Sequence, residues 1–341
     1  MGEPSDKPEP NPAAVESTAS TGYWNLPSPT LGGMQFWADQ CWFRGWRIQR
    51  NVFTGHYRLV DPANYRRAWG TCEQCQAALS REKRAAGLEP LTGRAVILVH
   101  GIIRSSNSFA AMRTALESEG YSVISFDYPS TRVPIQESAE SLNRVLESLE
   151  GIAEVNFVVH SMGGLVVRQS LATRKDPRIG RLVMLGVPNH GANLANMLKD
   201  YTLFKSVYGP AGQQLVEDPT GFIAGLPTPE FPFAVIAGGK GTAVGYNPWI
   251  AGDDDGTVAV SSTRLPGATD FMTVPTLHSF LMGDPAVIES TTRFLKGGCL
   301  SANNVANPIP RPPAAPANPV DSPVVQAGHE VGSRVKPKPK P

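Results

Sequence analysis

The sequence predicts an α/β domain, and three observations lead to that class. From residue 94 onward, short and nearly continuous apolar runs alternate with segments of helix-forming residues. These runs lack the polar–apolar alternation of half-exposed strands, so both faces of each strand are expected to be buried. With 41% hydrophobic and 18% charged residues, the chain can bury a large core. A mostly parallel central sheet with helices on both faces fits all three observations.

The elements of this domain follow one another in a regular order. Helices are expected near residues 106–119, 135–150 and 163–174, between the early strands. No internal repeat is visible. The six apolar runs expected as strands are Ala95–Val99, Tyr121–Phe126, Val155–Val159, Leu182–Leu185, Phe233–Ala237 and Phe271–Val274.

An aromatic-rich extension, residues 23–93, precedes this domain. Five of the six tryptophans lie within residues 23–70, and the run 52–57 predicts a hairpin around Gly55. Residues 73–86 predict a helix that stops at Gly87 and Pro90. Because tryptophan mostly supplies buried area, we expect extra strands packed on the main domain; a binding face is the alternative.

Proline marks the two ends of the chain. Six of the 31 prolines lie in residues 1–30 and ten in residues 301–341. Such a composition cannot bury enough apolar surface to fold. We therefore expect disordered tails at residues 1–22 and 301–341, and a main domain spanning residues 94–300.

Charge and hydropathy narrow the classes of partner. Lys plus Arg is 31 against 30 for Asp plus Glu, a net charge of +1, so binding of nucleic acid or an anionic membrane through charge is not expected. No run approaches the ~20 apolar residues of a membrane span, and no secretory signal is visible. The default expectation is a cytoplasmic protein, or a secreted one if a leader has been removed. Nothing indicates the oligomeric state.

The four cysteines do not make a disulfide scaffold. Cys72 and Cys75 form a C-x-x-C pair, while Cys41 and Cys299 stand alone. Half of a zinc site, a disulfide and inert thiols remain open as interpretations.

The sharpest motif is an apolar strand that runs directly into Ser161. The strand Val155–Val159 is followed by His160, Ser161, Met162 and two glycines, and then by a helical segment. A serine on such a tight turn has its hydroxyl pushed out at the carboxyl end of the sheet, beside the free N–H groups of the helix. This pattern is a nucleophile elbow.

The elbow resembles that of the α/β-hydrolase family, particularly its serine lipase and esterase branch, where it reads G-x-S-x-G and often G-H-S-M-G-G. Val159 stands where the first glycine usually is. The resemblance covers roughly residues 94–297. It implies a catalytic domain whose serine acts with a histidine and an acid, and requires no metal or organic cofactor.

A base and an acid for Ser161 can be sought along the chain. Of the histidines, only His278 and His329 follow the last plausible acid, and His329 lies in the proline-rich tail. His278 follows the last expected strand, where the resembled fold places its histidine. The resemblance maps the acid to Asp255 within the run 252–258; Asp253 and Asp254 remain alternatives. The order serine, acid, histidine is the α/β-hydrolase order.

A loop after the first expected strand resembles the oxyanion loop of the family. It reads His100-Gly101-Ile102-Ile103, and by this match the backbone N–H groups of Ile102 and Met162 would bind the oxyanion. We expect His100, His160 and His190 to hold loop geometry through hydrogen bonds rather than to transfer protons.

Residues 185–192 resemble the segment that lines the acyl site in many lipases. A cap or mobile lid is expected over about residues 192–232, where Leu194, Met197, Leu198 and Tyr201 form one apolar helical face. The residues expected to line the substrate site are Ile103, Pro188, His190, Leu194 and Leu198.

The resemblance therefore implies a serine hydrolase that cleaves carboxylic esters with lipophilic acyl groups through an acyl-enzyme. Its partner would be a small-molecule or lipid ester. The same residues are compatible with an amidase, a thioesterase or an acyltransferase, and part of the pattern resembles lipid-linked deacylases. A non-catalytic binding protein on a hydrolase scaffold is the second class.

Overall fold

The computed structural model describes residues 28–29, 35–192 and 202–312. The chain divides into two units, Met1–Pro310 and Arg311–Pro341. All helices and strands described below belong to the first unit.

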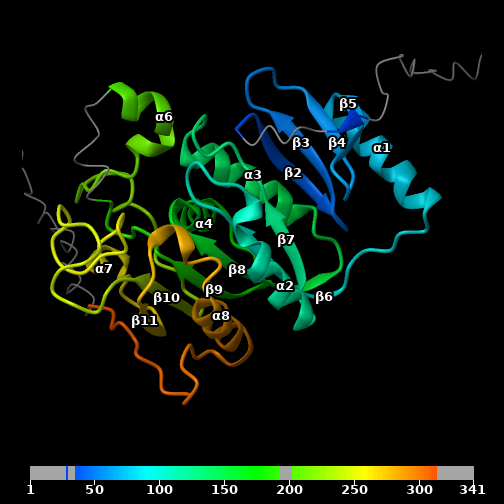
Figure 1. The fold of residues 1–341 in the computed structure, drawn as a ribbon. Coiled ribbons are helices and arrows are strands. Elements are labelled where there is room, and N and C mark those ends of the chain that lie inside the picture. Colours follow the sequence, from blue (N-terminus) through cyan, green and yellow to red (C-terminus); the bar gives the residue numbers. More distant parts are fainter. Residues whose placement is uncertain (1–27, 30–34, 193–201, 313–341) are drawn as a thin grey trace, which may run out of the picture. The chain divides into compact units, whose positions relative to one another are not determined.

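A six-stranded parallel sheet forms the centre of the main domain (Figure 1). Its strand order is β11-β10-β9-β8-β6-β7. β7 therefore lies on one side of β6, and all later strands lie on the other side. The carboxyl ends of β6 and β8 meet at this switch in strand order, where open α/β sheets bind ligands. All six predicted strands are confirmed. They are β6 (Gly93–Val99), β7 (Ser122–Phe126), β8 (Ile152–His160), β9 (Ile179–Leu185), β10 (Phe233–Gly238) and β11 (Asp270–Val274).

Helices cover both faces of this sheet, as its continuous apolar strands predict. In β6, Val96 and Leu98 belong to one core cluster with side chains of α2 (Ala110–Ser118) and α8 (Pro285–Gly297). Ile97 and Val99 belong to a second cluster with side chains of α3 (Ile135–Glu147) and α4 (Met162–Thr173). The three predicted helices correspond to the 3₁₀ helix η1 (Ser106–Phe109) with α2, to α3, and to α4.

The N-terminal extension forms a second, antiparallel sheet of five strands. Its order is β1-β5-β4-β3-β2, and α1 (Cys72–Ala85) packs on it over a small core that includes Phe43, Leu59 and Leu79. The predicted hairpin is confirmed: Gly55, with φ of 75°, lies in the turn between β3 and β4. The strands are β1 (Ser28–Pro29), β2 (Trp37–Phe43), β3 (Trp46–Asn51), β4 (Tyr57–Val60) and β5 (Tyr65–Gly70).

The second sheet packs against α3 and the end of β7. Gln40 Nε2 donates to Ser141 Oγ at 2.9 Å, and the Trp42 amide donates to Ser148 Oγ at 2.9 Å. The Asp39 amide donates to the Asp127 carbonyl at 3.0 Å. The aromatic-rich extension thus supplies packed strands, the first of the two interpretations of its tryptophans.

The chain between β9 and β10 includes α6 (Thr202–Gln213), with a kink at Gly209. The Ala192 amide donates to the Leu215 carbonyl at 2.9 Å, and this bond joins the chain shortly after β9 to the chain just after α6. Residues 193–201, which carry the expected apolar face with Leu194 and Leu198, lie outside the described residues.

Ordered contacts continue past residue 300, where the expected tail begins. The Ile309 amide donates to the Ala268 carbonyl at 2.9 Å, and the Gly267 amide to the Ile309 carbonyl at 2.7 Å. Asn307 Nδ2 donates to the Phe271 carbonyl of β11 at 3.2 Å, and the Ile309 side chain is buried. Residues 307–309 therefore lie beside residues 267–271, where β11 begins.

All four cysteines are free thiols, with Cys75 and Cys299 buried, so the disulfide interpretation is wrong. The described residues contain no group of three or more His, Cys, Asp or Glu placed to hold a metal ion. Among the described helices, none combines the length and apolar character of a membrane span.

Candidate active site

Ser161 occupies the turn between β8 and α4 in a strained backbone conformation. Its φ is 53° and its ψ −128°, a combination that residues with a side chain rarely adopt. The Ser161 amide donates to the Leu185 carbonyl at 2.9 Å. A Cβ atom at Gly163 would lie 2.7 Å from the His100 carbonyl oxygen, so only glycine allows α4 to start this close to β6.

Ser161, His278 and Asp255 form a continuous hydrogen-bonded chain. His278 Nε2 lies 3.0 Å from Ser161 Oγ, and His278 Nδ1 lies 2.6 Å from Asp255 Oδ2. One neutral tautomer satisfies both contacts: Nδ1–H donates to the carboxylate while Nε2 accepts the hydroxyl proton. The structure thus brings together the serine, base and acid that the sequence analysis singled out.

The Asp255 carboxylate is fully buried and fixed by its own turn. Its Oδ1 accepts from the Thr257 amide at 3.0 Å and from the Val258 amide at 2.7 Å, which leaves Oδ2 for His278. The His278 amide in turn donates to the Asp255 carbonyl at 2.9 Å. Two backbone donors and an imidazole therefore satisfy a carboxylate that burial alone would destabilise.

The two alternative acids serve the surrounding loops instead. Asp253 accepts from the amides of Lys240 and Gly241 at 2.7 and 2.8 Å. Asp254 Oδ1 accepts from the amides of Asn247 and Gly256 at 2.9 and 2.6 Å. Neither carboxylate is bonded to His278 within the described part of the chain.

His160 holds the backbone of His278. Its Nε2 donates to the His278 carbonyl at 3.0 Å, and the two ring centroids lie 4.6 Å apart. Burial, and secondarily the neighbouring His278, hold the pKa of His160 well below its usual value of 6.5. His160 is therefore a neutral hydrogen-bond donor beside the hydroxyl, which agrees with the loop-holding role expected for it.

The loop after β6 and the start of α4 each carry one of the two expected oxyanion donors, Ile102 and Met162. Within the described residues, the amides of Ile102 and Met162 donate to no other protein group. The next residue, Ile103, has a positive φ of 58°, and its amide donates to Ser130 Oγ at 3.0 Å. Met162 is the first residue of α4, so the positive end of the helix dipole lies at the same position.

Ser130 and Gly186 also lie at the candidate site, and the sequence analysis singled out neither of them. Ser130 is fully buried, and its Oγ also accepts from Gln35 Nε2 of the N-terminal extension at 3.2 Å. At Gly186, after β9, a Cβ atom would lie 3.1 Å from His278 Nδ1 and 3.2 Å from Asp255 Oδ2. Gly186 could have been found from the sequence, because it is a glycine at the end of a predicted strand. Ser130 could not, because a single serine in a turn does not indicate a contact with a distant loop.

The residues expected to line the substrate site fall in different places. The Ile103 side chain is 45% exposed beside the oxyanion loop, whereas Pro188 is buried. His190 Nε2 donates to the Arg264 carbonyl at 2.7 Å, and its amide donates to the Ser262 carbonyl, so its ring is held by the loop after α7 (Val260–Thr263).

His100 Nδ1 lies 2.8 Å from the Gly101 carbonyl, and its ring stacks on Tyr128.

Large apolar side chains are exposed on the loops that carry these residues. They come from the oxyanion loop, the loop before Asp255 and the turn around His278, and comprise Ile103, Val244, Trp249, Leu277 and Phe280. Trp249 is 74% exposed and Phe280 63% exposed. A contiguous patch of exposed apolar side chains marks a surface for apolar partners, and these loops supply five such side chains.

The chain is similar in part to several known proteins. A family model described as a domain of unknown function (DUF7379) matches residues 57–220. No protein with a curated function matches the sequence. The mature form of the lipase BlEst2 from Bacillus licheniformis is similar at 21% identity over 61% of this chain and 94% of its own, with a TM-score of 0.48.

Two further solved structures show the same kind of similarity. The phospholipase PlaB from Legionella pneumophila is 19% identical over 50% of this chain and 45% of its own, with a TM-score of 0.42. The metagenomic carboxyl esterase MGS0156 is 19% identical over 55% of this chain and 67% of its own, with a TM-score of 0.42. The parallel sheet, its strand order and the elbow after β8 define the class: the chain has the α/β-hydrolase fold.

Proposed function

We propose that the protein is a serine hydrolase that cleaves carboxylic esters with lipophilic acyl groups. The observation that carries the proposal is the chain Ser161 Oγ, His278 Nε2, His278 Nδ1 and Asp255 Oδ2, with links of 3.0 and 2.6 Å. A serine hydroxyl is a poor nucleophile near neutral pH, and it needs a base that a third group orients. Asp255 would supply that orientation from a fully buried position.

In the acylation step, Ser161 Oγ would attack the acyl carbon while His278 Nε2 takes the hydroxyl proton. Negative charge develops on the former carbonyl oxygen, which the amides of Ile102 and Met162 would stabilise. When the tetrahedral intermediate collapses, the bond from the acyl carbon to the alcohol oxygen breaks. The imidazolium of His278 would give its proton to that oxygen, which leaves an acyl group on Ser161.

Deacylation would repeat these steps with water. His278 would take a proton from the water as its oxygen attacks the acyl carbon, and would return the proton to Ser161 Oγ as the ester breaks. The products are a carboxylic acid and the enzyme in its starting state. Every proton transfer uses the same Nε2 atom, which explains why Nδ1 must stay bonded to Asp255.

The preference for lipophilic acyl groups is supported by the exposed apolar side chains around the site. Ile103, Leu277 and Phe280 adjoin the oxyanion loop and His278 in sequence, and each is at least 39% exposed. An apolar acyl chain that covered them would remove this surface from water, which is favourable in proportion to its area.

The test combines a covalent label with kinetics. A fluorophosphonate probe should label Ser161 in the wild-type protein, and Ser161→Ala should show no adduct. Hydrolysis of p-nitrophenyl butyrate should fall ~10⁵–10⁶-fold in the same variant. Unchanged hydrolysis by Ser161→Ala would disprove the assignment of the nucleophile.

A substrate panel then tests the class of bond. We expect p-nitrophenyl esters of medium and long acyl chains to have higher kcat/KM than the acetate ester. Matched anilide and thioester substrates serve as the comparison. Faster turnover of either would move the activity to an amidase or a thioesterase, whereas the absence of any fluorophosphonate adduct at Ser161 would favour the binding protein.

A further inference from the structure

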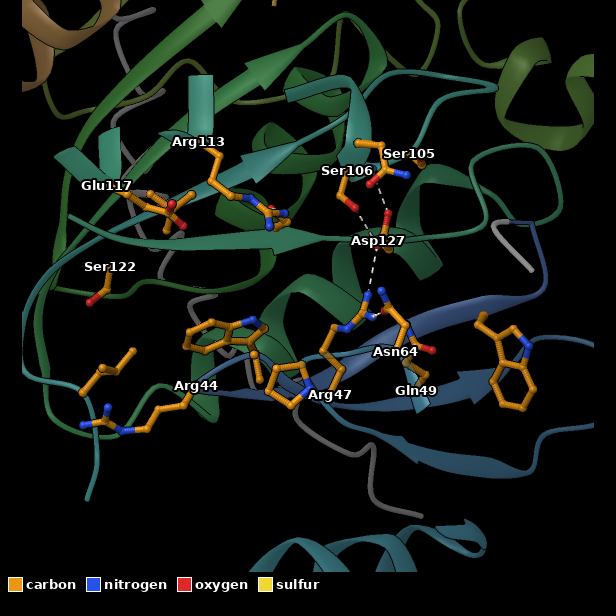
Figure 2. Close-up of a pocket in the computed structure, with 18 of the residues that line it drawn as sticks. Arg44, Arg47, Gln49, Asn64, Ser105, Ser106, Arg113, Glu117, Ser122 and Asp127 are labelled. Carbon is orange, nitrogen blue, oxygen red and sulfur yellow. Dashed lines mark hydrogen bonds and ion pairs between the residues drawn. The ribbon is translucent and has the colours of Figure 1, made fainter. Parts of the chain in front are cut away.

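A cavity lies between the N-terminal sheet and the edge of the main sheet (Figure 2). It has a volume of about 590 Å³ and is lined by residues of β2, β3 and β4 on one side and of α2 and β7 on the other. None of Ser161, Asp255 and His278 lines it. The volume falls in the range of natural small-molecule sites, which is roughly 300–1,000 Å³.

Positive charge predominates in the lining of this cavity. Four arginines line it against two carboxylates, those of Asp127 and Glu117. Asp127 is already engaged: it accepts from the Ser106 amide at 2.9 Å and Ser106 Oγ at 2.8 Å, and pairs with Arg47 at 3.2 Å. The second lining carboxylate is Glu117; behind the lining, the buried Asp39 carboxylate attracts Arg47 and Arg58.

Arg113 brings an unsatisfied donor into this lining. Its guanidinium donates from Nη2 to Ser125 Oγ, while its Nε is buried and has no hydrogen-bond partner among the described residues. Figure 2 shows Arg113 extending from the α2 side and Arg44 from the opposite wall. Nε is too buried to meet a ligand, but Nη1 has no hydrogen-bond partner among the described residues and is not buried, so it is the donor that a ligand in the cavity could engage.

The positive charges of neighbouring arginines in this lining also repel one another. Burial, and next the charge of Arg47, lower the pKa of Arg58 to about 10. Arg58 lies over the Trp37 ring at 4.0 Å and donates from Nε to Gln49 Oε1 at 2.8 Å, so its place is fixed. Cations held close together in a partly closed cavity focus a positive potential, which attracts anions.

We propose that this cavity binds a small organic anion through a phosphate or carboxylate group, with Arg113 and Arg44 as its principal ligands. The guanidinium group matches both oxyanions because it presents several N–H donors in one plane. Trp42 and Leu91, which also line the cavity, would contact the carbon skeleton of the ligand. The site is separate from the proposed ester hydrolysis and does not depend on it.

Isothermal titration calorimetry of the full-length protein at low ionic strength tests the proposal. The probes are inorganic phosphate, glycerol 3-phosphate and citrate. We expect at least one of them to bind, and the preferred probe distinguishes a phosphate from a carboxylate ligand. Arg113→Gln should weaken binding about tenfold or more, because a charge-assisted hydrogen bond is lost.

Three further variants separate a built site from general electrostatic attraction. Arg81→Gln changes the same charge on an exposed position of α1 and should leave the affinity within about twofold. Glu117→Gln should tighten binding, since it removes the opposing charge. Arg113→Lys should bind with intermediate affinity. The thermal unfolding midpoint without anion reports whether each variant is folded.

The proposal is overturned if none of the three probes binds to the wild-type protein. It is also overturned if Arg113→Gln and Arg81→Gln weaken binding equally, because the effect would then come from net charge rather than from the cavity. Weaker binding by Glu117→Gln would contradict it as well.

Discussion

Asp255 differs from its two neighbouring aspartates in what its side chain contacts, although all three stand in one run. Asp255 Oδ2 lies 2.6 Å from His278, whereas Asp253 accepts from the backbone of residues 240 and 241. A carboxylate that orients an imidazole determines which nitrogen carries the proton. The contact with His278, rather than the residue type, therefore singles out Asp255 as the proposed acid.

Replacing Asp255 by Asn should lower kcat about 10⁴-fold, because the amide would favour the wrong imidazole tautomer. Asp253→Asn is the matched control, since it makes the same change two positions away and should retain most of the activity. The measurement is kcat for p-nitrophenyl butyrate, with the thermal unfolding midpoint of both variants. A larger loss in Asp253→Asn would move the acid to that position.

His160 should make stability depend on pH. Its pKa is held well below 6.5 in the folded protein, so the unfolded chain binds more protons as the pH falls through 6.5. His160 therefore leaves the free energy of unfolding unchanged above about pH 6.5. As the pH falls below 6.5, this group lowers the free energy of unfolding. His160→Asn keeps a donor for the His278 carbonyl but removes the titration.

The cost of His160→Asn in free energy of unfolding should accordingly be smaller at pH 5 than at pH 7.5. Urea denaturation at the two pH values measures it. An equal cost at both values would mean that the imidazole is not buried in its neutral form.

At the scale of elements, the oxyanion loop depends on a contact from outside the parallel sheet. Ile103 adopts a positive φ, and its amide is bonded to Ser130 Oγ, which also accepts from Gln35. A β-branched residue in this conformation is strained and needs its surroundings to hold it. The N-terminal extension thus contributes to the shape of the loop through Gln35.

Ser130→Ala should lower kcat roughly tenfold to a hundredfold with a smaller change in KM, because the Ile102 amide would lose its fixed direction. Ser138→Ala is the control: Ser138 is equally buried in α3, and its Oγ has no hydrogen-bond partner among the described residues. Equal kinetics for the two variants would show that the contact to Ile103 does not matter for turnover.

These elements also show what a sequence can and cannot predict here. The six strands of the main sheet could be predicted because each is a continuous apolar run such as Ala95–Val99, bounded by a helical segment. The position of Ser161 followed from the strand–turn–helix pattern. Ser130 and the choice among Asp253, Asp254 and Asp255 could not be decided from the residues alone, because side-chain direction in a turn depends on backbone angles that the sequence pattern does not reveal.

At the scale of the whole molecule, amino-acid composition gives the wrong prediction for residues 307–309, which follow α8. Proline-rich residues from 301 onward predict a solvated tail, yet Asn307 and Ile309 make specific contacts with residues 268–271. Composition averages over a segment, whereas one buried isoleucine and four hydrogen bonds are enough to hold it. The cavity between the sheets is equally invisible in the sequence, since its arginines come from elements far apart in the chain.

Truncation after Ser301 should therefore destabilise the protein, whereas truncation after Pro310 keeps these contacts and serves as the control. Loss of the Ile309 side chain and of its backbone bonds should cost ~2–4 kcal/mol. The thermal unfolding midpoint should fall by roughly 5–10 °C relative to the longer truncation product. Equal midpoints would show that residues 302–310 contribute nothing to stability.

The segment beside β11 has one more consequence. β11 is an edge strand of the main sheet, and Asn307 Nδ2 donates to the Phe271 carbonyl of that strand. A protease cut before Asn307 would loosen this contact and leave the edge of β11 more open to other molecules, so clipped protein should cluster into sheet-rich aggregates on storage while the intact chain stays dispersed.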